Sequence, residues 1–128
     1  MEEWLRAKML ASAGITAIAG NHVDWGLRPA GDQMPGIGLT VISNPLARRM
    51  TGKPTWRDAR VQADCWATTP GEAIRLGRAI EDQFEGLRET VDGKKYRVFV
   101  IDADGKTEPD AARIAHRAQV DLRISYQV

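Results

Sequence analysis

The sequence is poor in the features that most directly indicate a function. Cys65 is its only cysteine, which excludes an internal disulfide and a multi-cysteine zinc site. The net charge is only +1, from 18 Lys and Arg against 17 Asp and Glu, so the surface as a whole lacks the field of a protein that grips nucleic acid or an acidic membrane. No apolar run approaches the length of a membrane span, and Met1 to Trp4 lack the basic and apolar regions of a signal peptide. We therefore expect a protein made in the cytoplasm, with no membrane partner.

What is present fits a folded domain. The chain has 128 residues, 43% of them hydrophobic and 27% charged, which is too apolar and too balanced in charge for a disordered chain. This length suits a single domain over 1–128.

The first half predicts a helix and two or three strands. Leu5, Met9 and Ala13 share one face of a helix that begins at Glu2 and is stopped by Gly14, and a short turn can follow over 15–19. A short strand is expected over 23–25, and the β-branched run 37–42 predicts a strand with both faces at least partly covered. The segment 43–55, rich in Pro, Gly and basic residues, predicts a long mobile loop.

The second half carries the clearest local signals. Alternation from Trp56 to Ala67 predicts a long half-buried strand. Thr69, Pro70 and Glu72 form a capping box that begins a helix ending near Gly86. Asp92-Gly93 predicts a hairpin turn, followed by a strand over 96–101, an acidic loop over 102–110 and a last strand over 118–126.

This order predicts an α+β fold. We expect one mainly antiparallel β-sheet, with an N-terminal helix and the capped central helix packed on one face, and the long basic loop between strands. The predicted core between sheet and capped helix consists of Val61, Ala63, Cys65, Ile80, Phe84, Val120, Leu122 and Ile124.

Three motifs that bind ligands are only partly present. Gly105-Lys106-Thr107 lacks the earlier glycine of a phosphate-binding loop, because Val100 stands in that position. The acids around Asp102 do not have the spacing of a calcium loop, and Val41 interrupts a dinucleotide fingerprint that would start at Gly36. We therefore expect no cofactor and no metal.

A catalytic cysteine is also disfavoured. Cys65 falls on the apolar face of its strand, and His22 and His116 are expected on other elements, without a sequence flank typical of a nucleophile. We expect a protein that is not an enzyme.

Positive charge is concentrated between Arg48 and Arg60, where five cations stand against Asp58 alone. Two interpretations remain open. The stretch can be a solvated loop with no function, or it can become ordered on meeting another subunit or DNA.

Tryptophan is the second unusual feature. Trp66 lies on the polar face of its strand and Trp56 at the root of the basic loop, with Trp25 elsewhere. Either a helix or loop covers these rings, or they belong to an interface, where Trp and Arg are enriched.

Several segments in this order resemble a known family. They are Val23-Asp24-Trp25, Pro29-Ala30-Gly31, Pro35 opening a strand, Arg60 to Ala67, the helix start at Pro70, and the strand Ala118 to Tyr126. The sequence resembles the tail terminator, or tail-completion, family of long non-contractile-tailed phages and gene transfer agents over nearly the whole chain. It departs from the familiar pattern at Gly36, where an aromatic is expected, and in the length of the loop 44–54.

The resemblance implies a structural role in head–tail joining. A hexameric ring of such subunits would cap the tail tube and meet a head–tail connector or stopper protein, in the neck of the virion, after assembly in the host cytoplasm. DNA would pass through the ring and could contact it without sequence preference. A ring needs two different surfaces on each subunit, and basic and acidic segments could supply them. The candidate interface residues are Arg48, Arg49, Lys53, Trp56, Arg57, Trp66, Asp102, Asp104 and Glu108.

Two other classes remain open from the sequence. A small adaptor domain unrelated to virions would have the same composition and would stay monomeric. A DNA-contacting module using residues 48–60 would bind duplex DNA with a steep dependence on salt.

Overall fold

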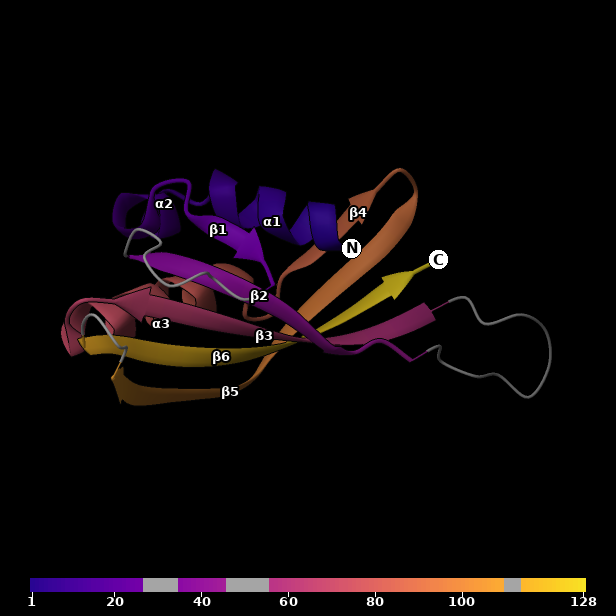
Figure 1. Ribbon diagram of the computed structural model, residues 1–128. Helices are drawn as coiled ribbons and strands as arrows, with labels where there is room; N and C mark the ends of the chain where they lie inside the picture. Colours follow the sequence, from indigo (N-terminus) through magenta and orange to yellow (C-terminus); the bar gives the residue numbers. More distant parts are fainter. Residues whose placement is uncertain (27–34, 46–55, 110–113) are drawn as a thin grey trace.

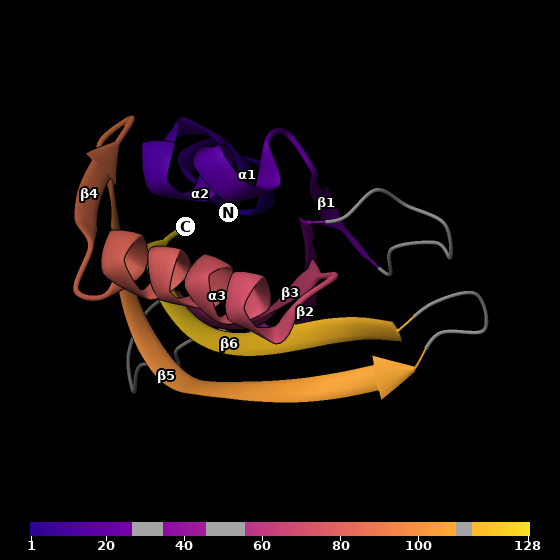
Figure 2. The same cartoon turned by 90° about the vertical axis from the view of Figure 1, so that its left-hand side faces the viewer.

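A curled six-stranded β-sheet encloses three helices on its concave side, as the two views at right angles show (Figure 1, Figure 2). The computed structural model describes residues 1–26, 35–45, 56–109 and 114–128, and only the backbone at 104–109 and 114–115. The helices are α1 (Glu2–Ala11), α2 (Ala13–Ala19) and α3 (Pro70–Phe84). The strands are β1 (Val23–Trp25), β2 (Gly36–Ser43), β3 (Trp56–Ala67), β4 (Arg88–Val91), β5 (Lys94–Pro109) and β6 (Ile114–Gln127).

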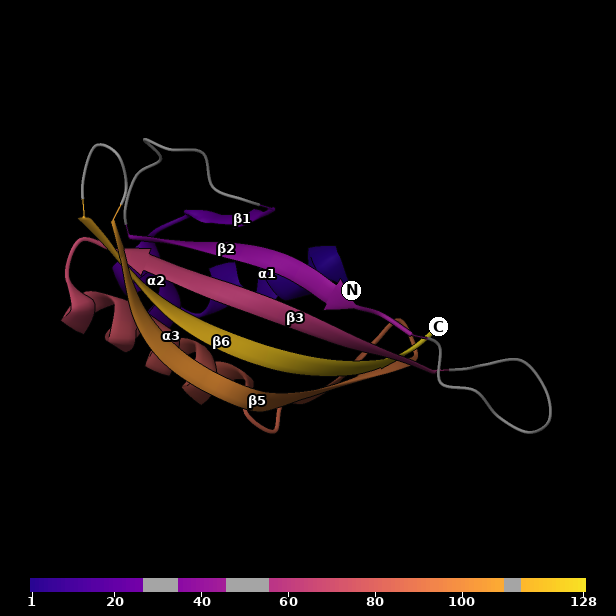
Figure 3. The same cartoon turned by 60° about the horizontal axis from the view of Figure 1, so that its bottom comes forward.

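The sheet has the strand order β1-β2-β3-β6-β5-β4. The pairs β2–β3, β3–β6, β6–β5 and β5–β4 are antiparallel, whereas β1 runs parallel to β2. The predicted α+β class is confirmed, and the sheet is mixed because β1 joins its edge. Seen from the convex side, the helices lie behind the sheet (Figure 3).

The N-terminal helix ends earlier than predicted. Its last residue is Ala11, because Ser12 adopts an extended conformation and its hydroxyl accepts a hydrogen bond from Ile15 N at 3.4 Å. Ser12 is thus the N-cap of a second helix, which is a favoured role for serine. The prediction that Gly14 stops the helix is wrong, and 15–19 belong to α2.

The capped central helix is confirmed. Thr69 Oγ1 accepts a hydrogen bond from Glu72 N at 3.3 Å, and Gly86 lies just past the helix end with φ +73°. Helix α3 packs closely on β6, where a Cβ on Gly77 would lie 3.4 Å from the Cβ of Ala118. Its buried face consists of Ala73, Leu76, Gly77, Ile80 and Phe84.

The core lies between the concave face and the three helices. All eight core residues predicted from the sequence are buried. The core also includes Leu5 and Met9 of α1 and Ile15 of α2. On the concave side of the sheet, α1 and α2 lie across this core from α3 (Figure 2). On β2, burial on both faces is confirmed only for Ile37 to Leu39, whereas Val41 to Ser43 are exposed.

The acidic segment is a strand, which corrects the predicted loop over 102–110. The predicted Asp92-Gly93 turn is confirmed, with φ +51° and +77°, but β5 then continues through Pro109. Its residues Asp102–Pro109 pair with Ile114–Asp121 of β6. The polar sequence hid this strand because it shows no apolar alternation, and the backbone ladder with β6 supplies the pairing instead. Asp110 lies outside the described residues.

Two β-bulges interrupt the ladders beside one row of the sheet. Val41, Val61, Leu122 and Val100 lie opposite one another across β2, β3, β6 and β5. On β2 the register shifts between Val41 and Ser43, and on β5 it shifts between Val100 and Asp102. Ile42 and Ile101 are therefore the extra residues of their strands, and both side chains are exposed.

Candidate functional site

The convex face of the sheet carries a network of paired charges on β3 and β6. Arg60 Nη2 lies 3.2 Å from Asp121 Oδ2, and Arg123 Nη2 lies 3.4 Å from Asp58 Oδ2. Arg60 and Arg123 are direct neighbours in the β3–β6 ladder. Each arginine pairs diagonally with an acid on the other strand, two residues from its direct neighbour. Alternation along β3 and β6 puts these side chains on the face opposite the core.

Two of the acids on this face are nearly buried. Asp64 and Asp121 are 8% and 7% exposed. Gln62 Nε2 donates to both carboxylate oxygens of Asp64, at 3.1 and 3.2 Å, and Arg117 Nη1 lies 3.7 Å from the same carboxylate. A buried carboxylate requires such partners, since its desolvation is costly. The network neutralises its own charges and leaves little field to attract a polyanion.

A tryptophan ring and an arginine guanidinium lie close together near each end of the convex face. Arg117 Cζ lies 5.4 Å from the centroid of the Trp66 ring, and Arg97 Cζ lies 5.6 Å from that of Trp56. These distances are within the range of cation–π contacts. The position of Trp66 on the polar face is confirmed, and Arg117 partly covers it.

Part of the predicted basic stretch lies outside the described residues. This applies to Arg48, Arg49 and Lys53, which fall within 46–55. Arg57 Nη1 donates to Asn44 O at 2.9 Å, and Asn44 Nδ2 donates to the Tyr126 hydroxyl, also at 2.9 Å. Arg57 therefore fastens the end of β2 to β3, and Arg60 pairs with Asp121.

The acidic side of the molecule is built by α3 and β5. Glu81 and Asp82 of α3, and Glu85 at the C-cap of this helix, line an open hollow together with Val100 to Ala103 of β5. Glu85 Oε2 accepts a hydrogen bond from Val100 N at 2.9 Å, and Asp102 is exposed. Of the predicted acidic residues, the side chains of Asp104 and Glu108 are not among those described. The structure therefore brings Asp102 together with three helix acids that the sequence prediction missed.

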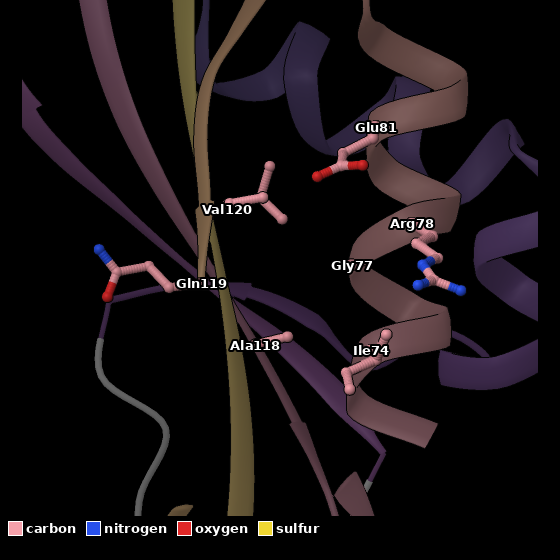
Figure 4. Close-up of a pocket in the computed structure, with 8 residues that line it drawn as sticks. Ile74, Gly77, Arg78, Glu81, Ala118, Gln119 and Val120 are labelled. Atoms are coloured by element: carbon pink, nitrogen blue, oxygen red, sulfur yellow. The ribbon is translucent and has the colours of Figure 1, made fainter. Parts of the chain in front are cut away.

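A second hollow, of about 240 Å³, lies between α3 and β6. Ile74 and Glu81 reach from α3 toward β6, whereas the Gln119 side chain points away from the helix (Figure 4). Gly77 and Ala118, where the helix packs closely on the strand, also line it. Of the described residues that line the hollow, Arg78 and Glu81 are titratable.

The residues considered for catalysis do not form a site. Cys65 is fully buried in the core, and burial, followed by the nearby Asp64 carboxylate, raises the pKa of its thiol far above the ordinary value. A thiol that stays protonated is a poor nucleophile. Within 1–26, 35–45, 56–109 and 114–128, no group of three His, Cys, Asp or Glu residues is arranged to hold a metal ion. No helix in the described part of the chain is long and apolar enough to span a membrane.

Comparison with known proteins decides the family. The family model for tail completion protein gp17 matches residues 3–127. The chain belongs to this tail completion family. This family agrees with the resemblance seen in the sequence.

Solved structures share the fold of this tail completion protein. One is a chain from the virion of a native gene transfer agent particle, with a TM-score of 0.69 and 13% identity over 96% of this chain and 92% of that one. A second has a TM-score of 0.59 and 17% identity over 100% of this chain and 95% of its own. A search of curated proteins finds no match.

Sequence reasoning missed the ion-pair network on the convex face of this tail completion protein. A signal was available, because arginine and aspartate recur at two- and four-residue steps on the polar faces of both β3 and β6. The sequence pattern does not say which arginine pairs with which aspartate. The register of β3 against β6 decides this, because it places Arg60 near Asp121.

Proposed function

We propose that this protein is a tail terminator. Its subunits, each a single domain over 1–128, form a hexameric ring that caps the tail tube and joins it to the head–tail connector. The ring assembles in the host cytoplasm and resides in the neck of the virion. The observation that carries the proposal is the match of the tail completion family model to residues 3–127.

The chemistry of the surface supports a structural role without catalysis. The thiol of Cys65 is sealed in the core, and the charges of the convex face pair with one another. The chain does carry two segments of opposite charge, the basic stretch 48–60 in the sequence and the acids on the side of α3 and β5. Different surfaces on the two sides of a subunit are what a closed head-to-tail ring requires.

Electron microscopy of the protein mixed with tail tubes tests the proposal. We expect rings at one end of each tube and tubes that no longer lengthen. Tubes that keep growing with bare ends would contradict it, whatever the protein does alone in solution.

The basic stretch can be tested by reversing its charges. The double substitution Arg48→Glu and Arg49→Glu should weaken ring formation or tail capping, most clearly at low salt, because surface charges act through long-range attraction. Reversing Arg75 and Arg78, on the exposed side of α3, is the matched control. If both double variants cap tail tubes equally well, Arg48 and Arg49 are not part of the interface.

Contact with DNA passing through the ring remains a secondary role for this stretch. Of its five cations, Arg57 is bonded to Asn44 O and Arg60 is paired with Asp121. These internal partners favour subunit contacts over a dedicated DNA-binding surface. A steep loss of duplex affinity with salt would be the signature of the DNA role.

A further inference from the structure

We infer that the ring closes edge to edge. The β2 edge of one subunit, around Ile42, docks on the β5 edge of the next subunit, around Ile101. This inference rests on the proposed ring and names the surfaces that form it. The partner is a second copy of this chain.

The first observation is the pair of bulges. Ile42 is 50% exposed and Ile101 is 48% exposed, and each is the one residue that its ladder leaves unpaired. Bulges re-aim side chains at the edges of sheets. Val41 and Phe99, at 36% and 42% exposure, extend the two apolar edges.

The second observation is that both bulges lie at one level of the sheet. They flank the same row, Val41–Val61–Leu122–Val100, on opposite sides of the four central strands. A closed ring requires its two complementary surfaces at the same height along the ring axis, since an offset would produce an open helix. We place the strands along that axis, and the shared row then puts both bulges at one height.

The third observation is that, among the residues that the structure describes, β2 beyond Leu39 and β5 beyond Asp102 have no partner strand on their outer sides. Strand β1 pairs with β2 only at Ile37 to Leu39, and β4 pairs with β5 only at Lys94 to Arg97. Leu87 and Glu85 then occupy the amides of Val98 and Val100, but in the part of the chain that the structure describes no strand covers β5 beyond Asp102. An uncovered edge is a template for pairing with another chain.

The charges around the two edges are complementary. Arg57 lies beside the end of β2, since it bonds Asn44 O, whereas Arg60, opposite Ser43, is already paired with Asp121. On the other edge, Glu81, Asp82, Glu85 and Asp102 line the same hollow as Ile101. Opposite charges at the rim of an apolar contact set its orientation and reject self-pairing of like edges.

Cross-linking tests the contact. The double variant Ile42→Cys/Ile101→Cys, treated with a short homobifunctional maleimide in solution and on tail tubes, should give a ladder of covalent oligomers. The variant Ile42→Cys/Ile74→Cys is the matched control, because Ile74 is 43% exposed but lies on α3. Native Cys65 is buried in both. A ladder from the first variant and none from the second is expected, and covalent dimers from Ile101→Cys alone would overturn the inference in favour of a symmetric pairing.

Mixing two blocked subunits gives an independent test. Ile42→Asp leaves the β5 edge intact and Ile101→Asp leaves the β2 edge intact, so each alone should lose self-association by about tenfold or more. A mixture of the two should form dimers and no rings, because one good interface remains between them. Rings from either variant alone would overturn the inference, and Ile74→Asp should still assemble.

The outcomes separate this inference from the proposed function. If unmodified protein caps tail tubes but the edge cysteines do not cross-link on those tubes, the edge contact is wrong and the terminator role stands. If the ladder forms and tubes remain uncapped, the contact stands and the terminator role fails.

Discussion

Trp66 and Arg117 are direct neighbours across β3 and β6, and the guanidinium lies over the indole ring, with Cζ 5.4 Å from the ring centroid. The same arginine lies 3.7 Å from the nearly buried Asp64 carboxylate. One side chain thus links the half-buried Trp66 ring to the charge network of the convex face.

A double-mutant cycle on this pair should give a coupling of about 0.5–1 kcal/mol, the range of a cation–π contact near solvent. The single change Arg117→Met should be the more harmful, because it also removes the cation beside Asp64. Trp66→Leu and the double variant complete the cycle, measured by urea unfolding. A coupling of zero would mean that ring and guanidinium are neighbours without an interaction.

Phe84 anchors α3 in the core and is fully buried. Phe84→Ala should lower the free energy of unfolding by about 3–5 kcal/mol, a large part of the stability of a small domain. Ile74→Ala on the exposed side of the same helix should change it by less than about 0.5 kcal/mol. Equal effects of the two changes on the melting curve would show that the helix face is assigned wrongly.

The contribution of the Thr69 N-cap to the free energy of unfolding can be measured separately. Thr69→Ala removes the acceptor for Glu72 N and should cost about 1 kcal/mol, whereas Thr69→Asp keeps an acceptor and should cost much less. Chemical denaturation of both variants provides the comparison. Identical losses from the two variants would show that a side-chain acceptor for Glu72 N does not contribute to stability.

Cys65 should make stability fall in alkaline solution. Its pKa is raised in the folded protein by burial, so the folded thiol keeps its proton while the unfolded thiol loses it above about pH 8.5. The unfolded state then binds fewer protons than the native state. The contribution of Cys65 to stability is therefore complete below that pH and declines above it by up to about 1.4 kcal/mol per pH unit.

The free energy of unfolding, measured from pH 7 to 10, tests this dependence on pH. In the variant Cys65→Ala, the decrease caused by the thiol should be absent. A thiol reagent added to the native protein at pH 8 should react only as fast as the protein unfolds. Rapid modification of folded protein would contradict the buried position of the thiol.

Local sequence rules predicted the parts of the fold that local physics controls. Thr69 and Pro70 specify a helix start by hydrogen bonding and backbone restriction, and Asp92-Gly93 specifies a hairpin by tolerating positive φ. The alternation of Val61 to Ala67 identified the buried face, because one side of that strand meets only the core.

The errors lie where long-range pairing prevailed over local pattern. One error is local instead: α1 ends before Gly14 because Ser12 is extended and its hydroxyl accepts a hydrogen bond from Ile15 N as the N-cap of α2. Asp102 to Pro109 have no strand signal of their own and are extended because β6 is long enough to pair with them. The stack of Trp4, Tyr96 and Tyr126, with centroids 4.5 and 5.6 Å apart, joins three elements that no local rule connects.

The candidate site was predicted by residue type better than by geometry. Asp102 was predicted to belong to an acidic loop. Its neighbours Glu81 and Glu85 come from α3 and its C-cap, whose charged side was not predicted to be part of the site. Bulges at Ile42 and Ile101 leave no mark in composition, because an extra residue in a strand is visible only against its partner.

The bulge at Ile101 also bears on how the gene can change. Because Val100 pairs with Leu122 and Asp102 with Asp121, loss of the Ile101 codon would leave every later residue of β5 opposite its present partner. A codon lost at Val98 would instead exchange the inner and outer side chains along the neighbouring stretch of strand. The fold of the single subunit therefore tolerates loss of residue 101, so any constraint that keeps an isoleucine at this position comes from a contact outside the subunit.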